Sequence, residues 1–314
     1  MALETRKLGG TGFDVTVLAY GALELRGSPR GRDVSDEEAG QLLNTVLDSG
    51  INLIDVAPEY GRGEDLIGRH LAARRDEFFL SSKCGCPLEL DPPSPWRHDY
   101  SPTHVRACVE RSLTRLRTDH LDLVQLHASP SRDVLEREGT IGELVKLRDE
   151  GKIRFIGMSG TLPHLRDQAA MGVFDIFQIP YSGLQREHEA LISEIADLGS
   201  GTMIRGALAR GVPVFAKDWR LPDNPTSSAL GIQRLVDRWL KADIHDLLEG
   251  ATPIGFMLRF ALSHPGLCTA LVGTASLDEL RANVATAARG PLPSDVYAEA
   301  KERFTRAEPA PADS

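Results

Sequence analysis

Four residues of complementary chemistry follow short apolar runs in this sequence of 314 residues. Asp55 lies at the end of NLIDV, with Tyr60 five residues later; Lys83 lies in FFLSSKCG, and His127 ends LDLVQLH. A lysine ammonium beside a tyrosine favours the phenolate and lowers its pKa from about 10. Asp55 would hold that lysine, and His127 would donate a hydrogen bond to an oxygen that gains charge. The four residues together make a candidate proton donor.

Two other interpretations of these residues are weaker. The stretch GRGEDL resembles a phosphate-binding glycine loop, but Leu66 stands where the third glycine of G-x-G-x-x-G belongs. A metal-dependent hydrolase could use Asp55 and His127, yet the sequence shows no further His, Asp or Glu pair with ligand spacing at the ends of the runs, and Lys83 would repel a divalent ion. We therefore expect no metal site.

The elements that must position these residues alternate regularly between short β-rich runs and helical patterns. The helical segment 35–50 begins with Ser35 before acidic residues and ends at Gly50. Eight strands are expected, at 15–21, 52–56, 78–85, 121–127, 154–160, 176–182, 202–208 and 269–274. A strand and helix repeated eight times predicts an α/β fold, a (β/α)8 TIM barrel, in which the carboxyl ends of the strands converge. A short N-terminal β-hairpin is expected at 6–15.

The chain shows no interdomain linker, so a single barrel domain over 1–314 is expected. Connections 86–101 and 209–228 are long and follow the carboxyl ends of strands, where they are either lids or surface insertions. Residues 305–314 are rich in proline and alanine and are expected to form a disordered tail.

Composition excludes several classes of partner. The net charge of −9 and scattered basic residues predict no nucleic-acid binding. No apolar stretch is long enough to cross a membrane, and the start lacks a signal peptide, so we expect a cytoplasmic protein with no membrane partner. Four cysteines with no metal or redox spacing are expected to be reduced thiols.

With these residues in place, the sequence resembles the aldo-keto reductases. IDVAPEYGRGEDLIG resembles the family's Asp-Thr-Ala-x-x-Tyr-Gly-x-x-Glu signature, SSKCG its lysine strand and VQLHAS its histidine strand, and the match covers nearly the whole chain. The resemblance implies a catalytic tetrad of Asp55, Tyr60, Lys83 and His127. It also implies an NAD(P)-dependent oxidoreductase that reduces an aldehyde or ketone, or oxidises the alcohol, by direct hydride transfer with Tyr60 as general acid or base.

The resemblance also implies a set of cofactor-binding residues. Ser159 and Gln178 match positions that hold the nicotinamide carboxamide, although Gly160 replaces the family's usual asparagine. Arg205 stands where many members stack a tyrosine on the ring, and an arginine plane can also stack. The remaining expected contacts lie near the pyrophosphate or the adenosine: Gly206, Leu208, Arg210, Gly273, Thr274, Glu279 and Asn283.

The choice of cofactor stays open in the sequence. The family usually favours NADP(H), but Glu279 occupies a position where arginine is common, and Arg281 is the only cation expected close by, so NAD(H) is also possible. The substrate is a small-molecule carbonyl or alcohol that the sequence does not identify, with a sugar as one possibility. Trp96, Tyr100, Trp219 and Tyr20 either line the mouth or only pack.

A second functional class also stays open, a nicotinamide-binding regulatory subunit of aldo-keto reductase type with little turnover. Such subunits can keep the tetrad, but this chain has no conspicuous extra domain or exposed apolar helix for a partner. The oligomeric state is not readable from the sequence.

Overall fold

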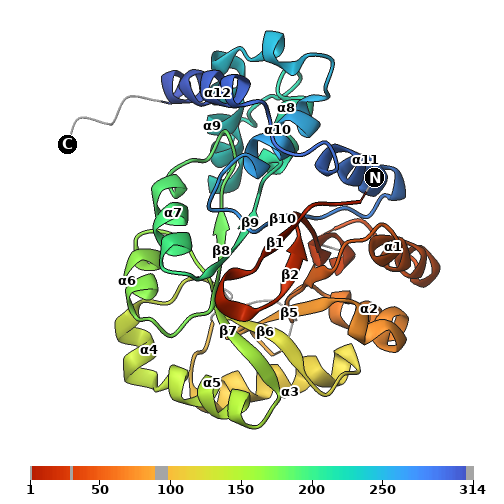
Figure 1. Ribbon diagram of the computed structural model, residues 1–314, viewed down its shortest axis with the longest axis vertical. Coiled ribbons are helices and arrows are strands. Elements are labelled where there is room, and N and C mark those ends of the chain that lie inside the picture. The colour runs from red at the N-terminus through yellow and green to blue at the C-terminus, as the bar shows by residue number, and fades with distance from the viewer. Residues whose placement is uncertain (1, 29–30, 89–97, 309–314) are drawn as a thin grey trace.

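The computed structural model describes residues 2–28, 31–88 and 98–308 and contains a closed barrel of eight parallel strands (Figure 1). In barrel order the strands are β3 (Leu18–Gly21), β4 (Leu53–Asp55), β5 (Phe79–Cys84), β6 (Leu121–Leu126), β7 (Ile153–Ser159), β8 (Ile176–Pro180), β9 (Gly201–Arg205) and β10 (Thr269–Val272). β10 pairs with β3 and closes the ring. The predicted (β/α)8 barrel is confirmed.

The predicted N-terminal hairpin is also present, as β1 (Thr5–Lys7) paired antiparallel with β2 (Asp14–Thr16). The single strand expected over 15–21 is therefore wrong at its start, since its first residues belong to the hairpin. Leu8 of the hairpin loop joins an apolar cluster inside the barrel. The close approach of this loop requires glycine, because a Cβ on Gly9 would lie 2.2 Å from the backbone nitrogen of Gly201. The hairpin thus plugs one end of the barrel.

Helices surround the barrel in Figure 1. They are α1 (Asp36–Asp48), α2 (Gly63–Leu71), α3 (Pro102–Leu116), α4 (Arg132–Glu138), α5 (Thr140–Asp149), α6 (His164–Ala170), α7 (Glu189–Asp197), α8 (Val212–Phe215), α9 (Ser227–Ala242), α10 (Pro253–Leu262), α11 (Leu277–Ala287) and α12 (Ser294–Ala307). α1 starts as predicted, with a capping box in which Ser35 accepts from the Glu38 backbone and Glu38 accepts from the Ser35 backbone. Among the described residues, no helix has both the length and the apolar character that a membrane crossing requires.

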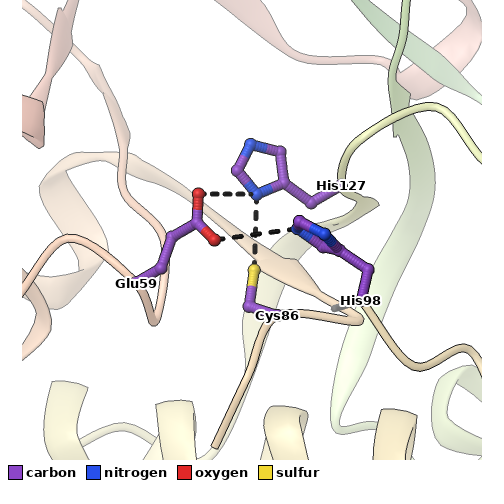
Figure 2. A group of neighbouring side chains, drawn as sticks. All are labelled: Glu59, Cys86, His98 and His127. Atoms are coloured by element: carbon purple, nitrogen blue, oxygen red, sulfur yellow. Dashed lines mark hydrogen bonds and ion pairs between the residues drawn. The ribbon is translucent and has the colours of Figure 1, made fainter. Parts of the chain in front are cut away.

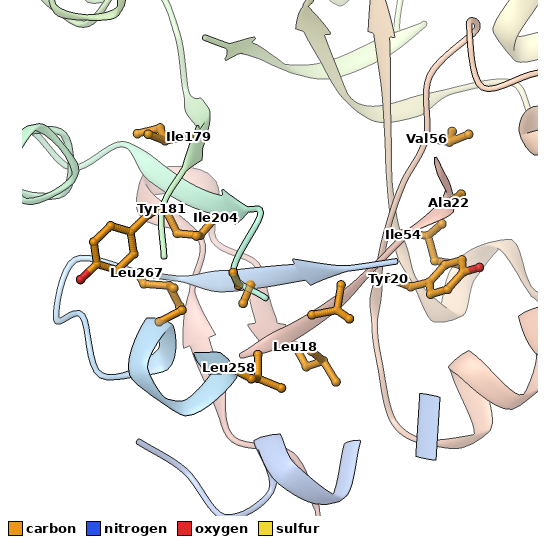
Figure 3. Packing of buried hydrophobic residues seen from close by; sticks show 14 of the residues in the cluster. Leu18, Tyr20, Ala22, Ile54, Val56, Ile179, Tyr181, Ile204, Leu258 and Leu267 are labelled. Carbon is orange, nitrogen blue, oxygen red and sulfur yellow. The ribbon is translucent and has the colours of Figure 1, made fainter. Parts of the chain in front are cut away.

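The outward faces of the strands pack against these helices in one large apolar cluster. Figure 3 shows part of it, with Leu18 and Tyr20 on β3, Ile54 on β4 and Leu258 on α10. Tyr20 is buried there and donates a hydrogen bond of 2.9 Å to the Thr274 carbonyl. Tyr20 therefore packs in the outer core and does not line the mouth of the barrel.

Along the inner face of the barrel the character of the side chains changes from apolar to polar. Because side chains alternate between faces, residues two apart line the interior. The apolar layer joined by Leu8 consists of residues from seven strands: Ala19, Leu53, Phe79, Leu123, Ile176, Met203 and Leu271. Two residues further along, β4, β5 and β6 carry Asp55, Ser81 and Gln125, all buried. The polar groups are thus collected towards the carboxyl ends of the strands.

The two long connections and the tail are described in part. Residues 89–97, including Trp96, and residues 309–314 lie outside the described residues. In the second connection, Trp219 packs on Phe215 with ring centroids 5.7 Å apart and donates to Gln233. These contacts favour a packing role for Trp219. α12 continues through Ala307, so disorder from residue 305 is not what the structure shows.

Candidate active site

A buried ion pair lies at the centre of the polar layer. Lys83 of β5 donates to the Asp55 carboxylate at 2.6 Å and to the Val56 carbonyl at 2.9 Å. Burial acts to lower the pKa of Lys83, but the charges of Asp55 and Tyr60 raise it to about 12. The ammonium is therefore permanently charged at neutral pH.

Two neutral groups hold the carboxylate of this pair. Ser81 donates to Asp55 Oδ1 at 2.9 Å, and the Gln125 side-chain nitrogen donates to the same oxygen at 2.9 Å. Gly157 on the next strand leaves room for Gln125, because a Cβ there would lie 3.0 Å from Gln125 Cγ. With a full set of partners, Asp55 has one fixed orientation towards Lys83.

Tyr60 lies over this pair in the connection between β4 and α2. Its ring centroid is 5.0 Å from Lys83 Nζ. The turn that follows needs glycine at Gly61, which has a φ of +52° and where a Cβ would lie 2.1 Å from the Arg26 carbonyl oxygen. The glycines of GRG thus serve the turn into α2, which begins at Gly63.

The pKa of Tyr60 is shifted in the direction opposite to the one expected from Lys83 alone. Burial raises the pKa of the hydroxyl, and the positive charge of Lys83 only partly opposes this rise, while the negative charges of Asp55 and Glu59 add to it. The net shift is upwards, not downwards as the Lys83 argument predicts, because desolvation of the phenolate outweighs the lysine. Tyr60 therefore carries its proton at neutral pH.

His127 lies just beyond the end of β6 and has partners on several elements. Its Nδ1 is 3.2 Å from a Glu59 carboxylate oxygen and 3.4 Å from the Cys86 sulfur. Tyr100 donates to the His127 carbonyl at 2.6 Å, so this tyrosine braces the histidine backbone. Burial, together with the charges of Lys83, His98 and Arg205, holds the pKa of His127 well below its usual value. His127 therefore stays neutral at neutral pH.

A second polar pair lies across β7 and β8. Ser159 and Gln178 are neighbours in the strand register, and the serine hydroxyl donates to the Gln178 side-chain oxygen at 3.2 Å. The Gln178 side-chain nitrogen is buried and has no hydrogen-bond partner among the described residues. A buried amide donor without a partner is costly unless a ligand supplies an acceptor. This pair is suited to a planar amide.

The segment after β9 carries the next group of expected contacts. Arg205 ends the strand, and burial lowers the pKa of its guanidinium although the charge of Asp55 acts to raise it. Gly206 follows with a φ of +73°, and Leu208 accepts a backbone hydrogen bond from Gly211 in the turn that contains Arg210. A partly buried arginine at the strand end and an exposed arginine in the turn that follows favour an anionic ligand.

After β10, the chain brings the remaining expected residues together. Gly273 is exposed, Thr274 and Asn283 are buried, and the Thr274 hydroxyl donates to Glu279 at 2.5 Å. One more cation lies at this segment although it is far away in the sequence. Arg32 donates to the Ala275 carbonyl at 2.8 Å. The expectation that Arg281 is the only cation close to this segment is therefore wrong. Only the closure of the barrel between β3 and β10 brings Arg32 here.

Sequence reasoning also missed the residues around His127. Glu59 adjoins Tyr60, Cys86 shows no metal or redox spacing with the other cysteines, and His98 lies in a connection without regular structure. All three gather at His127 (Figure 2). The sequence shows no further His, Asp or Glu pair with ligand spacing at the strand ends, and these side chains come instead from separate connections that the fold brings together. The one available signal was that Glu59 and Cys86 lie within a few residues of strand ends.

Comparison with known proteins agrees with this geometry. The sequence model of the Aldo/keto reductase family matches residues 17–303. The chain belongs to this family. All eight strands of the barrel and the residues of the candidate site lie inside the matched region.

Several relatives of the chain have named activities. The L-galactose dehydrogenase of Arabidopsis thaliana is 29% identical over 90% of this chain and 88% of its own. The NADH-specific methylglyoxal reductase of Escherichia coli is 28% identical over 88% and 91%. A glycerol dehydrogenase structure from Gluconobacter oxydans has a TM-score of 0.80 and 26% identity over 100% and 98% of the two chains. The chain is thus similar over its full length to oxidoreductases of its family.

Proposed function

We propose that the protein is an NAD(P)(H)-dependent oxidoreductase that reduces an aldehyde or ketone to an alcohol, or catalyses the reverse reaction. The observation that carries this proposal is the fully buried Asp55–Lys83 pair beneath the ring of Tyr60. A fixed cation beside a phenol stabilises the phenolate that forms when the phenol gives up its proton. The barrel places this donor at the carboxyl end of its strands, where barrels carry their active sites.

The proposed roles of the four residues follow from their contacts. Tyr60, protonated at neutral pH, gives its proton to the carbonyl oxygen as that oxygen gains charge. Lys83 stays charged and stabilises the phenolate, and Asp55 holds Lys83 in place. His127 donates a second hydrogen bond to the same oxygen. In alcohol oxidation the Tyr60 phenolate takes the proton back.

The cofactor proposal rests on the Ser159–Gln178 pair. The unpaired Gln178 nitrogen would donate to the carboxamide oxygen of a nicotinamide, and the Ser159 hydroxyl lies beside it. A reduced dinucleotide held there would supply the hydride for the carbonyl carbon. Arg205 would lie against the ring, and the turn through Gly206, Leu208 and Arg210 would face the pyrophosphate.

We infer a preference for NADP(H), with NAD(H) also bound. Arg32 and Arg281 flank the segment through Gly273, Thr274 and Glu279, next to the buried Asn283 that would contact the adenine. Two guanidinium groups favour a 2′-phosphate. Glu279 opposes it, but its carboxylate already accepts a hydrogen bond from Thr274.

The proposed substrate class is a small polar carbonyl compound or the corresponding alcohol. The groups described at the mouth are polar or charged, namely Glu59, His98, His127 and Arg205, with exposed side-chain fractions of 16–18% for the first three. Relatives named for methylglyoxal, L-galactose and glycerol act on small oxygenated molecules.

The test is a comparison of the native protein with Tyr60→Phe on a panel of small aldehydes and ketones that includes methylglyoxal. We expect kcat to fall by at least about 100-fold, because general acid catalysis contributes that much. The affinities for NADPH and NADH, measured by cofactor fluorescence, should stay within a few-fold. An unchanged kcat would contradict the role of Tyr60. Dinucleotide binding with no turnover of any panel member would favour the regulatory subunit.

A further inference from the structure

The strongest unassigned feature is a cluster of four ligand-type side chains beside His127. Glu59 comes from the connection after β4, Cys86 from just beyond β5, His98 from the segment before α3, and His127 from the end of β6. Each offers one ligand atom, and the four atoms all lie within 4.8 Å of one another. Figure 2 shows the four side chains pointing towards a common centre.

From this arrangement we propose that the protein binds one Zn²⁺ ion, or a divalent ion of similar preference, through Glu59, Cys86, His98 and His127. One thiolate, two imidazoles and one carboxylate are ligand types that zinc takes, and four ligands complete a tetrahedron. This site lies beside the proposed carbonyl chemistry: it shares His127 with it, and Glu59 and His98 also belong to the proposed substrate mouth.

The distances fit the size of such a site. Zinc bonds of about 2.0–2.3 Å put neighbouring ligand atoms of a tetrahedron roughly 3.3–3.8 Å apart. In the structure, His127 Nδ1 is 3.2 Å from Glu59 Oε1 and 3.4 Å from Cys86 Sγ, and His98 Nε2 is 3.7 Å from Glu59 Oε2. The ligand atoms therefore need only small movements to close around an ion.

The charge balance of the surroundings also allows a divalent ion. Cys86 binds as a thiolate after its proton is released to solvent, and with the Glu59 carboxylate it balances two positive charges. Lys83, which argues against a cation in this region, is already paired with Asp55 at 2.6 Å. The site is also accessible, because the side chains of Glu59, His98 and His127 are 16%, 16% and 18% exposed.

Metal binding at this place is compatible with the proposed role of His127. The cluster uses Nδ1, while the second ring nitrogen points away from it (Figure 2). A metal on Nδ1 leaves the proton of a neutral imidazole on Nε2, where it can be donated. The donation by Nε2 rests on the proposed function, whereas the metal site itself does not.

The test uses the full-length protein, freed of metal by dialysis against a chelator and then titrated with ZnCl₂ or CoCl₂. We expect one equivalent of zinc by elemental analysis, and a cobalt spectrum with a thiolate charge-transfer band and tetrahedral d–d bands. Cys86→Ser should lose the charge-transfer band, and His98→Ala should weaken zinc affinity by at least about 10-fold. Cys268→Ser, which changes a distant thiol, should behave as the native protein does.

Thermal unfolding gives a readout that does not depend on activity. An ion that binds only the folded chain raises the melting temperature with its concentration. We expect this rise in the native protein and in Cys268→Ser, and its absence in Cys86→Ser. Less than one equivalent of zinc, an octahedral cobalt spectrum, or equal binding by Cys86→Ser would overturn the site. Zinc binding in a chain that reduces no carbonyl would leave the site standing and count against the proposed function alone.

Discussion

At the scale of single residues, the site depends on a charge that has no access to water. Lys83 has no exposed side-chain area, and it donates hydrogen bonds to Asp55 and to the Val56 carbonyl. A buried charge is tolerable only while its partner is present. The same burial that raises the pKa of Tyr60 makes the phenolate dependent on Lys83 when the proton leaves.

Replacing one partner of the Asp55–Lys83 pair should therefore lower the free energy of unfolding more than replacing both partners. We expect Asp55→Asn to lower the free energy of unfolding by about 3–5 kcal/mol, because Lys83 keeps its charge without a counter-ion. The double variant Asp55→Asn/Lys83→Met should lose less than Asp55→Asn alone. Urea unfolding of the native protein, Asp55→Asn, Lys83→Met and the double variant measures the difference. A double-variant loss equal to the sum of the two single losses would show that the pair is not coupled.

The positions of Asp55, Lys83 and His127 could be predicted because each lies at or next to the carboxyl end of a recognisable strand, and Tyr60 follows in the connection after β4. The surroundings of these residues could not be predicted. The direction of the Tyr60 shift depends on how deeply the ring is covered, which no spacing reveals. Arg32 reaches the segment after β10 only through barrel closure.

At the scale of elements, local sequence signals predict where helices begin. The N-terminal hairpin, by contrast, shortens the first predicted strand. Ser35 and Glu38 form the capping box that the sequence predicts. The break between β2 and β3 is not visible in the sequence, because 15–21 is one continuous run of strand-forming residues. The division arises from the pairing of β2 with β1 outside the barrel. Local pattern thus predicts that an element exists, and tertiary pairing decides its bounds.

The cap of α1 gives a prediction at this scale. Ser35→Ala removes the side-chain acceptor for the Glu38 backbone, and we expect a loss of about 1 kcal/mol in the free energy of unfolding. Ser35→Asp keeps an acceptor at this position and should stay within a few tenths of the native value. Chemical denaturation of the three proteins provides the measurement. A loss for Ser35→Asp as large as that for Ser35→Ala would rule out the cap as the cause.

At the scale of the whole molecule, the outer core contains histidines that must stay neutral. His264 is buried against Tyr181, its Nδ1 accepts from the Gly266 backbone at 3.1 Å, and its Nε2 faces the Glu189 carbonyl at 3.2 Å. Burial lowers the pKa of His264. His188 is similar, since burial lowers its pKa and its Nε2 accepts from the Leu162 backbone.

These lowered pKa values determine a direction of acid sensitivity. Because the unfolded chain takes up a proton near pH 6.5 more readily than the folded one, the stability that the neutral histidine contributes is present above that pH and is lost as the pH falls. We expect the free energy of unfolding to fall between pH 7.5 and 5. His264→Asn, which does not titrate, should fall less steeply. A slope equal to that of the native protein would mean that His264 does not contribute.

We propose that the barrel binds a nicotinamide dinucleotide and passes its hydride to a carbonyl carbon. The most direct measurement uses NADPH that carries deuterium at both C4 positions of the nicotinamide, with methylglyoxal as the probe and the product analysed by mass spectrometry. We expect an alcohol with one deuterium on its carbinol carbon, formed by the native protein and at least about 100-fold more slowly by Tyr60→Phe. Reduced product without deuterium on that carbon would contradict this proposal.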